Sequence, residues 1–278
     1  MRNDGLLAPV AAALGLDLVS VFGGGELGAG LVRDGQGADL VLKVLPGPEW
    51  AGRFARGATL AGRLRSATYP VPRYTGTGVH DRVSWSLQER LPGSVPDVMT
   101  AAHARRLVGL ARRHAGAAGR RDDVRARLDQ ELDGAAARLA GFPEAAALVR
   151  DLTAAHDRHA PGLRDGDVVH GDFHHRNFLA VGDRVTGVFD WELAWAGDGR
   201  LDLVTLACWA SWVPEQFTPA ARRVAVEAAE AACESGVLAL FAAHVALRTL
   251  DFDARTHPDR LPGLVAAVDA STRAWLRG

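Results

Sequence analysis

A short stretch in the second half of the chain gathers side chains that can bind metal ions or move protons. Between residues 170 and 177 it holds three imidazoles, a carboxylate and an amide, namely His170, Asp172, His174, His175 and Asn177. A further carboxylate, Asp190, follows thirteen residues after Asn177. Apolar, β-branched runs at 167–169 and 185–189 predict short strands on either side. We therefore expect the polar side chains on loops at strand ends, where scaffolds commonly carry catalytic groups.

The same imidazoles and carboxylate also form a pattern by which hydrolases bind zinc or a pair of metal ions. Such a centre needs more ligands from elsewhere in the chain. The later histidines, His244 and His257, have no partner motif around them. This interpretation also gives no role to Asn177 or Asp190, so we favour a different chemistry.

Several motifs follow one another along this half of the chain. His170-Gly171-Asp172, then Asn177, then Asp190-Trp191-Glu192 resembles the aminoglycoside phosphotransferase and choline-kinase-like family. Gly197-Asp198 followed by Asp202-Leu203 resembles that family's "GDP…DL" signature, although glycine stands at position 199 where proline is usual. The resemblance extends over nearly the whole chain. It implies an α+β, bilobal, protein-kinase-like fold with a small β-rich N-terminal lobe and a larger, mainly helical C-terminal lobe.

The resemblance also implies roles for the polar side chains. In phosphoryl transfer the protein mainly positions the reactants and neutralises charge. Asp172 is then the general base that accepts the proton of a substrate hydroxyl, and ATP is the phosphoryl donor. Asn177 and Asp190 are then ligands of Mg²⁺, which prefers hard oxygen atoms. His170 and Asp202 are expected to support the loop and the following helix.

A glycine-rich run at 23–30 is expected to cover the phosphates of the nucleotide. Glycines let backbone amides approach phosphate oxygens because no side chain intervenes. The residues assigned to nucleotide binding there are Gly25, Glu26 and Gly28. Further along, Gln88, Glu89 and Leu91 resemble the hinge segment whose backbone binds the adenine edge.

Lys43 is the single lysine among 32 basic residues and stands in an apolar predicted strand. A charge in such a strand is costly unless it is paired or binds an anion. Lys43 resembles the family lysine that holds the α- and β-phosphates. The family also has a glutamate in the following helix, usually within R-E-A, but this sequence reads Arg56-Gly57-Ala58. Glu49, at the start of that helix, is the nearest candidate to pair with the lysine.

The acceptor is less well defined by the sequence. From Asp190 to the C-terminus there are 12 acidic residues against 8 arginines, and such an excess can steer a basic molecule to a site. The side chains considered for acceptor binding are Glu192, Trp195 and Asp198. We expect a small, cationic antibiotic as acceptor, either an aminoglycoside or a basic peptide antibiotic. The alternatives are a metabolic kinase of the choline, homoserine or thioribose type and a catalytically silent nucleotide-binding protein.

The elements that must position these residues divide at a Gly/Pro-containing connector, 93–96. Residues 1–93 are predicted as a nucleotide-binding lobe with strands near 17–22, 31–33, 39–45, 71–75 and 83–89 and a helix at 49–65. Residues 94–278 are predicted as a catalytic and acceptor-binding lobe with helices at 100–116, 122–139, 143–160 and beyond 201. Apolar residues that recur at every second position predict the strands, and apolar residues spaced by three or four predict the helices.

Composition narrows the class of protein. Hydrophobic residues make up 48% and the net charge is -1, which fits a folded globular chain without the basic field of a nucleic-acid binder. The two cysteines form neither a disulfide framework nor a metal motif. No run of about 18 apolar residues is evident, so we expect no membrane span. We expect a cytoplasmic monomer or homodimer that binds a small molecule.

Overall fold

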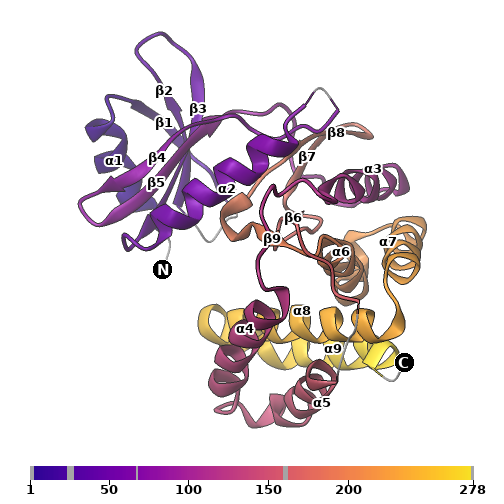
Figure 1. Cartoon of the computed structure of the whole chain (residues 1–278). Coiled ribbons are helices and arrows are strands. Elements are labelled where there is room, and N and C mark those ends of the chain that lie inside the picture. The colour runs from indigo at the N-terminus through magenta and orange to yellow at the C-terminus, as the bar shows by residue number, and fades with distance from the viewer. Residues whose placement is uncertain (1–2, 24–27, 67, 159–161, 277–278) are drawn as a thin grey trace. The chain divides into compact units, whose positions relative to one another are not determined.

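The computed structural model describes residues 3–23, 28–66, 68–158 and 162–276. The chain forms two compact units. The first unit comprises Met1–Ser94, Phe178–Val181 and Val185–Trp195, and the second comprises Val95–Asn177, Gly182–Arg184 and Ala196–Gly278. Figure 1 shows the order of the elements along the chain.

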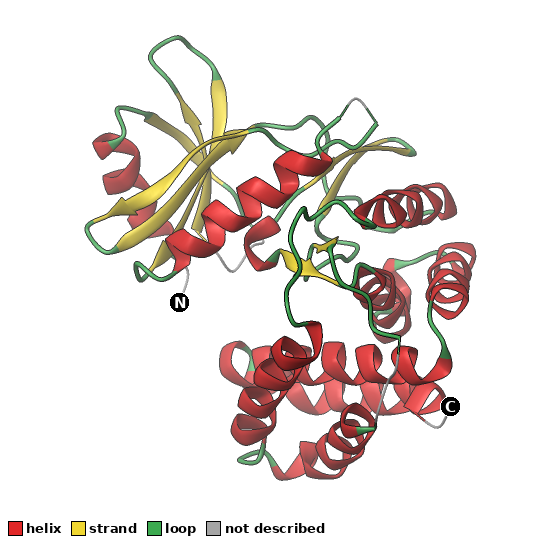
Figure 2. Ribbon diagram, viewed as in Figure 1, coloured by secondary structure: helices red, strands yellow, loops and turns green. Residues whose placement is uncertain are grey.

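The first unit is built on a five-stranded antiparallel sheet in the order β1-β2-β3-β5-β4 (Figure 2). Its strands are β1 (Asp17–Val21), β2 (Gly28–Arg33), β3 (Asp39–Pro46), β4 (Tyr74–His80) and β5 (Val83–Glu89). Its helices are η1 (Asp4–Leu6), α1 (Leu7–Ala13) and α2 (Trp50–Leu64). The predicted strand at 71–75 is wrong in its bounds, because the strand begins only at Tyr74 and runs on to His80.

The central strand β3 sends alternate side chains to opposite faces of this sheet, as the period of two requires. Leu42 and Val44 are fully buried in a core that includes Leu7 and Val10 of α1. Lys43 therefore points to the other face, where it is only 5% exposed. The sheet thus places one buried cation opposite its apolar core.

Two stretches that the sequence-based division gave to the second lobe pack with the first unit instead. They contain β7 (Phe178–Val181), most of β8 (Arg184–Val188) and the short helix η4 (Trp191–Leu193). Ser94 and Ala180 exchange two backbone hydrogen bonds, and the amide of Val188 donates to the carbonyl of Pro70. These backbone bonds join segments far apart in sequence, which is why a single cut after residue 93 does not describe the first unit.

Helix α2 approaches η4 closely at Gly57. A β-carbon on Gly57 would overlap the backbone carbonyl of Trp191. Glycine is therefore required here for close packing, and not for a turn. Gly52 and Gly62 on the same helix have open space around the position of a β-carbon.

We expect Gly57→Ala to destabilise the first unit by about 1–3 kcal/mol, because overpacking must push η4 away from α2. Gly52→Ala and Gly62→Ala should instead stabilise the helix by about 0.5–1 kcal/mol, since alanine loses less backbone entropy than glycine. Urea denaturation of the three variants checks this. Equal effects at all three positions would show that the contact of Gly57 with Trp191 does not matter.

The second unit is mainly helical. Its helices are α3 (Ala101–Ala111), η2 (Arg112–His114), α4 (Val124–Leu139), η3 (Pro143–Ala145), α5 (Ala146–Asp157), α6 (Arg200–Trp212), η5 (Pro214–Gln216), α7 (Pro219–Ala232), α8 (Ser235–Thr256), η6 (Pro258–Arg260) and α9 (Leu261–Leu276). Two short strands, β6 (Asp167–Val169) and β9 (Trp195–Gly197), form a small sheet. The predicted helix at 100–116 is shorter, because η2 and then Gly116, with φ of 66°, end it.

Helix α8 runs through the middle of the second unit, packed by α4, α5, α6 and α9 (Figure 1). By length and composition alone this helix could cross a membrane, in contrast to the expectation of no membrane span. In the structure, 78% of its apolar window is buried, as in the core helix of a globular fold. One such helix is weak evidence for a membrane span.

Two buried histidines face each other on α5 and α8. His156 and His244 are 0% and 2% exposed, and their ring centroids lie 6.5 Å apart. His244 Nε2 lies 3.3 Å from Glu131 Oε2 of α4, whereas neither ring nitrogen of His156 makes a hydrogen bond within the described part of the chain. Burial, helped by the positive charges of His244 and Arg125, lowers the pKa of His156 to about 4 against the opposing charges of Asp129 and Asp157.

This lowered pKa predicts acid sensitivity. Between pH 6.5 and 4 the unfolded chain takes up a proton at His156 that the folded chain refuses, so stability is full above pH 6.5 and falls as the pH drops through this window. The expected loss is about 3 kcal/mol. His156→Leu should flatten the pH dependence of the free energy of unfolding over this range, whereas His80→Gln, at a half-buried position, should not. An unchanged slope in His156→Leu would contradict this assignment.

Candidate active site

Asp172 and Asn177 lie on one loop of the second unit, which begins after β6. The Asn177 Nδ2 donates to both the backbone oxygen and the Oδ2 of Asp172, each at 2.8 Å. His174 closes the same turn, with its Nε2 3.2 Å from Asp172 Oδ2. Gly171, just before Asp172, has φ of 82°, a left-handed conformation that favours glycine. The motif spacing thus folds the carboxylate and the amide against each other.

Asp202 of α6 holds this loop through the backbone amides at its start. Its buried carboxylate accepts hydrogen bonds from the amides of His170 at 2.8 Å and Gly171 at 3.1 Å. It also lies 2.9 Å from His114 Nδ1. The His170 Nδ1 in turn accepts from the amide of Asp172 at 3.2 Å. The side chains of His170 and Asp202 therefore hold the backbone of the loop, as expected for supporting residues.

The Asp172 carboxylate is surrounded by positive charge. Burial opposes its ionisation, but the charge and hydrogen bond of His174 and the charge of Arg248 outweigh this and hold the pKa of Asp172 well below its usual range. The Arg248 Nη2 of α8 lies 3.6 Å from Asp172 Oδ1. Asp172 is thus a carboxylate at neutral pH that can accept a hydrogen bond and later a proton.

Lys43 of the first unit forms a buried ion triad with Asp190 and Glu192. The Lys43 Nζ lies 2.6 Å from Asp190 Oδ1 and also binds Glu192 Oε1. Burial alone would lower the pKa of Lys43, but the two carboxylates outweigh burial and raise it. Asp190 itself has φ of 67°, an uncommon left-handed conformation for a residue other than glycine. Such local strain is typical of functional positions.

The acids that pair with Lys43 are therefore Asp190 and Glu192, and the proposal of Glu49 is wrong. The Glu49 carboxylate lies instead beside Gly47, near the start of α2. The position of the family glutamate is Gly57, where the backbone of Trp191 leaves no room for a side chain. Because η4 approaches so closely there, the neighbouring Glu192 reaches Lys43 in place of a helix residue.

The oxygen atoms needed for Mg²⁺ are present. Among the described residues, neither Asn177 Oδ1 nor Asp190 Oδ2 takes part in a hydrogen bond, while the other polar atom of each side chain is held. An amide oxygen and a carboxylate oxygen are both ligands that Mg²⁺ accepts. Each of these two side chains thus offers an oxygen atom that suits this metal ion.

The imidazoles of the motif do not gather as metal ligands. Each has a different partner: His170 binds the amide of Asp172, His174 lies against Asp172, and His175 Nε2 is 2.5 Å from Gln216 Oε1. Within the described ranges, no group of three His, Cys, Asp or Glu side chains could hold a metal ion.

A family model described as "phosphotransferase enzyme family" matches residues 19–254. The chain belongs to this family. No curated protein sequence matches it significantly. As a phosphotransferase, it acts on a hydroxyl group, in agreement with the resemblance of its motifs.

Solved structures share the fold of this phosphotransferase at low sequence identity. A thermostable mutant of the aminoglycoside phosphotransferase APH(4)-Ia, in a ternary complex with AMP-PNP and hygromycin B, is 18% identical with a TM-score of 0.70, covering 97% of this chain and 98% of that chain. The macrolide 2′-phosphotransferase MphH from Brachybacterium faecium is 21% identical with a TM-score of 0.57, covering 96% and 97%. An aminoglycoside-3′-phosphotransferase of type VIII is 23% identical with a TM-score of 0.60, covering 88% and 98%. The predicted α+β, kinase-like fold is confirmed.

The side chains considered for acceptor binding in this phosphotransferase are all buried. Asp198 is 0% exposed and pairs with Arg200 Nη2 at 2.6 Å. Trp195 is 3% exposed, and Glu192 is bound to Lys43. These three side chains are bound within the scaffold, and their assignment to the acceptor stays a prediction.

The residues assigned to the nucleotide are described only in part. Gly25 and Glu26 lie outside the described residues. Gly28 begins β2, where a β-carbon would lie 2.9 Å from Val44 Cγ2, so it is needed for packing. In β5, Gln88 is 5% exposed and paired with strands on both sides.

The end of this hinge segment is also fixed by local contacts. The Glu89 Oε2 accepts from Arg65 Nη2 at 2.9 Å and from the amide of Arg73 at 3.1 Å. The Leu91 side chain lies over Gly187 of β8. The amide of Glu89 also donates to the carbonyl of Arg73 at 2.8 Å. That the backbone of this segment binds the adenine edge stays a prediction.

Two neighbours of Asp172 were missed in the sequence. His174 stands two positions after Asp172 in the motif, and this short spacing is a signal that its ring can reach the carboxylate. Arg248 comes from α8, far along the chain, and nothing in its local sequence marks it. Trp209 of α6 stacks beside His174, with ring centroids 4.8 Å apart. Such long-range neighbours depend on helix packing.

Proposed function

We propose that this phosphotransferase transfers the γ-phosphate of ATP to a hydroxyl of a small antibiotic and so confers resistance in the cytoplasm. The observation that carries the proposal is the hydrogen-bonded pair of Asp172 and Asn177 on one loop. This pair joins a candidate base to a candidate Mg²⁺ ligand at the spacing that the motif requires. The structures of similar fold that contain AMP-PNP or ADP support ATP as donor.

Each polar side chain has a separate role in the proposed phosphoryl transfer. Asp172 accepts a hydrogen bond from the acceptor hydroxyl, aims its oxygen and takes its proton. The oxygen forms the new bond to the γ-phosphorus as the bond from that phosphorus to the bridging oxygen breaks and ADP leaves. Asn177 and Asp190 each offer an oxygen atom to Mg²⁺, and Lys43 offers a buried positive charge to phosphate oxygens. When bound, Mg²⁺ neutralises charge on the transferring phosphoryl group. Asp202 and His170 keep the loop in place.

An aminoglycoside or a basic peptide antibiotic is the first candidate for the acceptor. The related fold that binds hygromycin B, a small-molecule antibiotic, supports this. The acidic excess of the C-terminal region supports it less than the sequence suggested. Asp198 pairs with Arg200, and Asp251 lies 2.6 Å from Arg138 and 3.2 Å from Arg255. These acids are already neutralised.

A metabolic acceptor is the second candidate, and within that class Arg248 favours a neutral or acidic alcohol over choline. A guanidinium 3.6 Å from Asp172 places positive charge beside the reacting hydroxyl. Two like charges about 4 Å apart repel by about 4 kcal/mol at an effective dielectric constant near 20. An acceptor with an ammonium next to its reacting hydroxyl would meet this repulsion, whereas a neutral or acidic alcohol would not.

A screen of ATP consumption tests the proposal. The panel should contain aminoglycosides, basic peptide antibiotics, macrolides, amino alcohols and hydroxy acids, each with Mg²⁺. Turnover of an antibiotic, together with raised tolerance in a host that expresses the protein, is the expected result. Turnover confined to metabolites, amino alcohols included, would support the second candidate. Binding of Mg-ATP without turnover of any acceptor would overturn both.

A further inference from the structure

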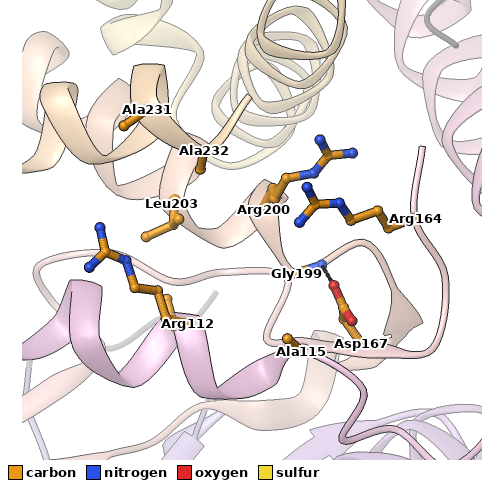
Figure 3. A pocket seen from close by; sticks show the side chains of 10 residues that line it. Arg112, Ala115, Arg164, Asp167, Gly199, Arg200, Leu203, Ala231 and Ala232 are labelled. Carbon is orange, nitrogen blue, oxygen red and sulfur yellow. Dashed lines mark hydrogen bonds between the residues drawn. The ribbon is translucent and has the colours of Figure 1, made fainter. Parts of the chain in front are cut away.

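A cavity of about 300 Å³ in the second unit is lined by three arginines from different elements. Arg112 comes from η2, Arg164 from the loop before β6, and Arg200 from the first turn of α6 (Figure 3). The rest of the wall is mainly apolar and includes Leu203 and Ala232. Neither Asp172 nor Asn177 lines this cavity. It is therefore a feature separate from the loop that carries the candidate base.

The charge of the cavity is positive. Asp167 is the one acid that lines it, and both of its carboxylate oxygens are occupied, one by the amide of Gly116 and one by the amide of Gly199. The lining thus holds three guanidinium groups and one carboxylate, while the charges of Asp198 and Glu234, behind the wall, act on Arg200.

The arginines differ in how firmly they are held. Arg200 is 6% exposed, and its Nε and Nη2 are fixed by Asp198 and the carbonyl of Gly162. Arg112 and Arg164 are exposed, and within the described ranges neither side chain has a carboxylate partner. One guanidinium is thus pre-positioned while two others can close on a ligand. The planar fork of arginine matches phosphate and carboxylate oxygens in pairs.

The cavity adjoins the residues that hold the catalytic loop. Arg112 is two residues from His114, and Arg200 is two residues from Asp202. His114 and Asp202 pair with each other, and Asp202 holds the amides of His170 and Gly171. A ligand that binds both Arg112 and Arg200 would therefore tie η2 to α6 next to the pair that supports the loop.

We propose that this cavity binds a compact phosphate dianion, as a free ion or as a small phosphate monoester, and that binding stiffens the loop of Asp172. The two guanidinium groups without a carboxylate partner match a double negative charge. The apolar part of the wall leaves room for the body of a small ester.

Calorimetric titration of the full chain with inorganic phosphate tests the binding, with glycerol phosphate as the ester arm and chloride and acetate at equal ionic strength as controls. We expect phosphate to bind more tightly than either control ion. Arg112→Gln/Arg164→Gln should weaken phosphate binding by about tenfold or more, since hydrogen bonds to charged groups are lost. The matched control, Arg222→Gln/Arg223→Gln on α7, removes the same charge elsewhere and should bind as the wild type does.

Two outcomes would overturn the site. One is binding no tighter than that of chloride or acetate. The other is equal binding by the two double variants, which would place the phosphate elsewhere, for example at the nucleotide site. Tighter binding of glycerol phosphate than of phosphate would assign the site to an ester, and the reverse to the free ion.

Hydrogen exchange tests the link to the loop without depending on turnover. Phosphate should slow exchange at the amides of His170 and Gly171 in the wild type but not in Arg112→Gln/Arg164→Gln. Unchanged exchange at these amides with phosphate bound would overturn the stiffening. Neither measurement requires an acceptor, so both separate this inference from the proposed function.

Discussion

Asp172→Asn lowers kcat by roughly 10²–10⁴-fold, the usual contribution of a positioned general base, and leaves ATP binding largely intact. The substitution keeps the size of the side chain, and an amide oxygen at position 172 can still accept from Asn177 Nδ2. What is lost is the negative charge that takes the proton of the acceptor hydroxyl. Initial rates at saturating acceptor and ATP, together with calorimetry of nucleotide binding, measure the two effects separately.

Asp165→Asn is the matched control for this variant. Asp165 is a partly exposed acid near Arg121, with 3.5 Å between the charged atoms, and it lies on the same unit. Its amide variant should turn over at the wild-type rate. Wild-type turnover in Asp172→Asn itself would remove Asp172 from the role of base. A large loss of nucleotide binding in that variant would instead mean that the loop had moved.

Lys43→Met lowers kcat/KM for ATP by roughly 10²–10³-fold, as removal of one pre-positioned electrostatic contact typically does. It should also destabilise the protein by about 3 kcal/mol, because removing one partner leaves the carboxylates of Asp190 and Glu192 without their buried counter-ion. Methionine keeps the length of the side chain, so the charge is the main change. Urea denaturation and initial rates at varied ATP concentration measure the two losses.

Glu192→Gln separates the two roles of Lys43. Added to Lys43→Met, it removes one of the two uncompensated carboxylates and should restore part of the stability while leaving activity low. The four proteins of this double-mutant cycle give the coupling between the two side chains directly. If the double variant were less stable than Lys43→Met alone, the ion pair of Lys43 with Glu192 would not account for the stability loss.

Local sequence determined much of this protein. The spacing of apolar residues predicts most helices and strands, because the period of each element is a property of its own backbone. The motif around Asp172 and Asn177 predicts that both stand on a loop after a short strand, and the structure adds the hydrogen bonds between them. A lone lysine in an apolar strand predicts a buried, paired cation, because an unpaired charge there would be too costly.

Contacts between distant parts of the chain were decided only by the tertiary structure. Lys43 pairs with Asp190 and Glu192 and not with Glu49, because the close approach of η4 to α2 at Gly57 brings Glu192 to the lysine. Asp198 reads as an acceptor ligand in the sequence but is buried against Arg200.

Arg248 beside Asp172, and the three arginines around the cavity, come from segments that no local pattern connects. Sequence spacing fixes which face of an element a side chain occupies. Which side chains it contacts on another element depends on how the elements pack. Packing of this kind placed the charge of Arg248 beside Asp172.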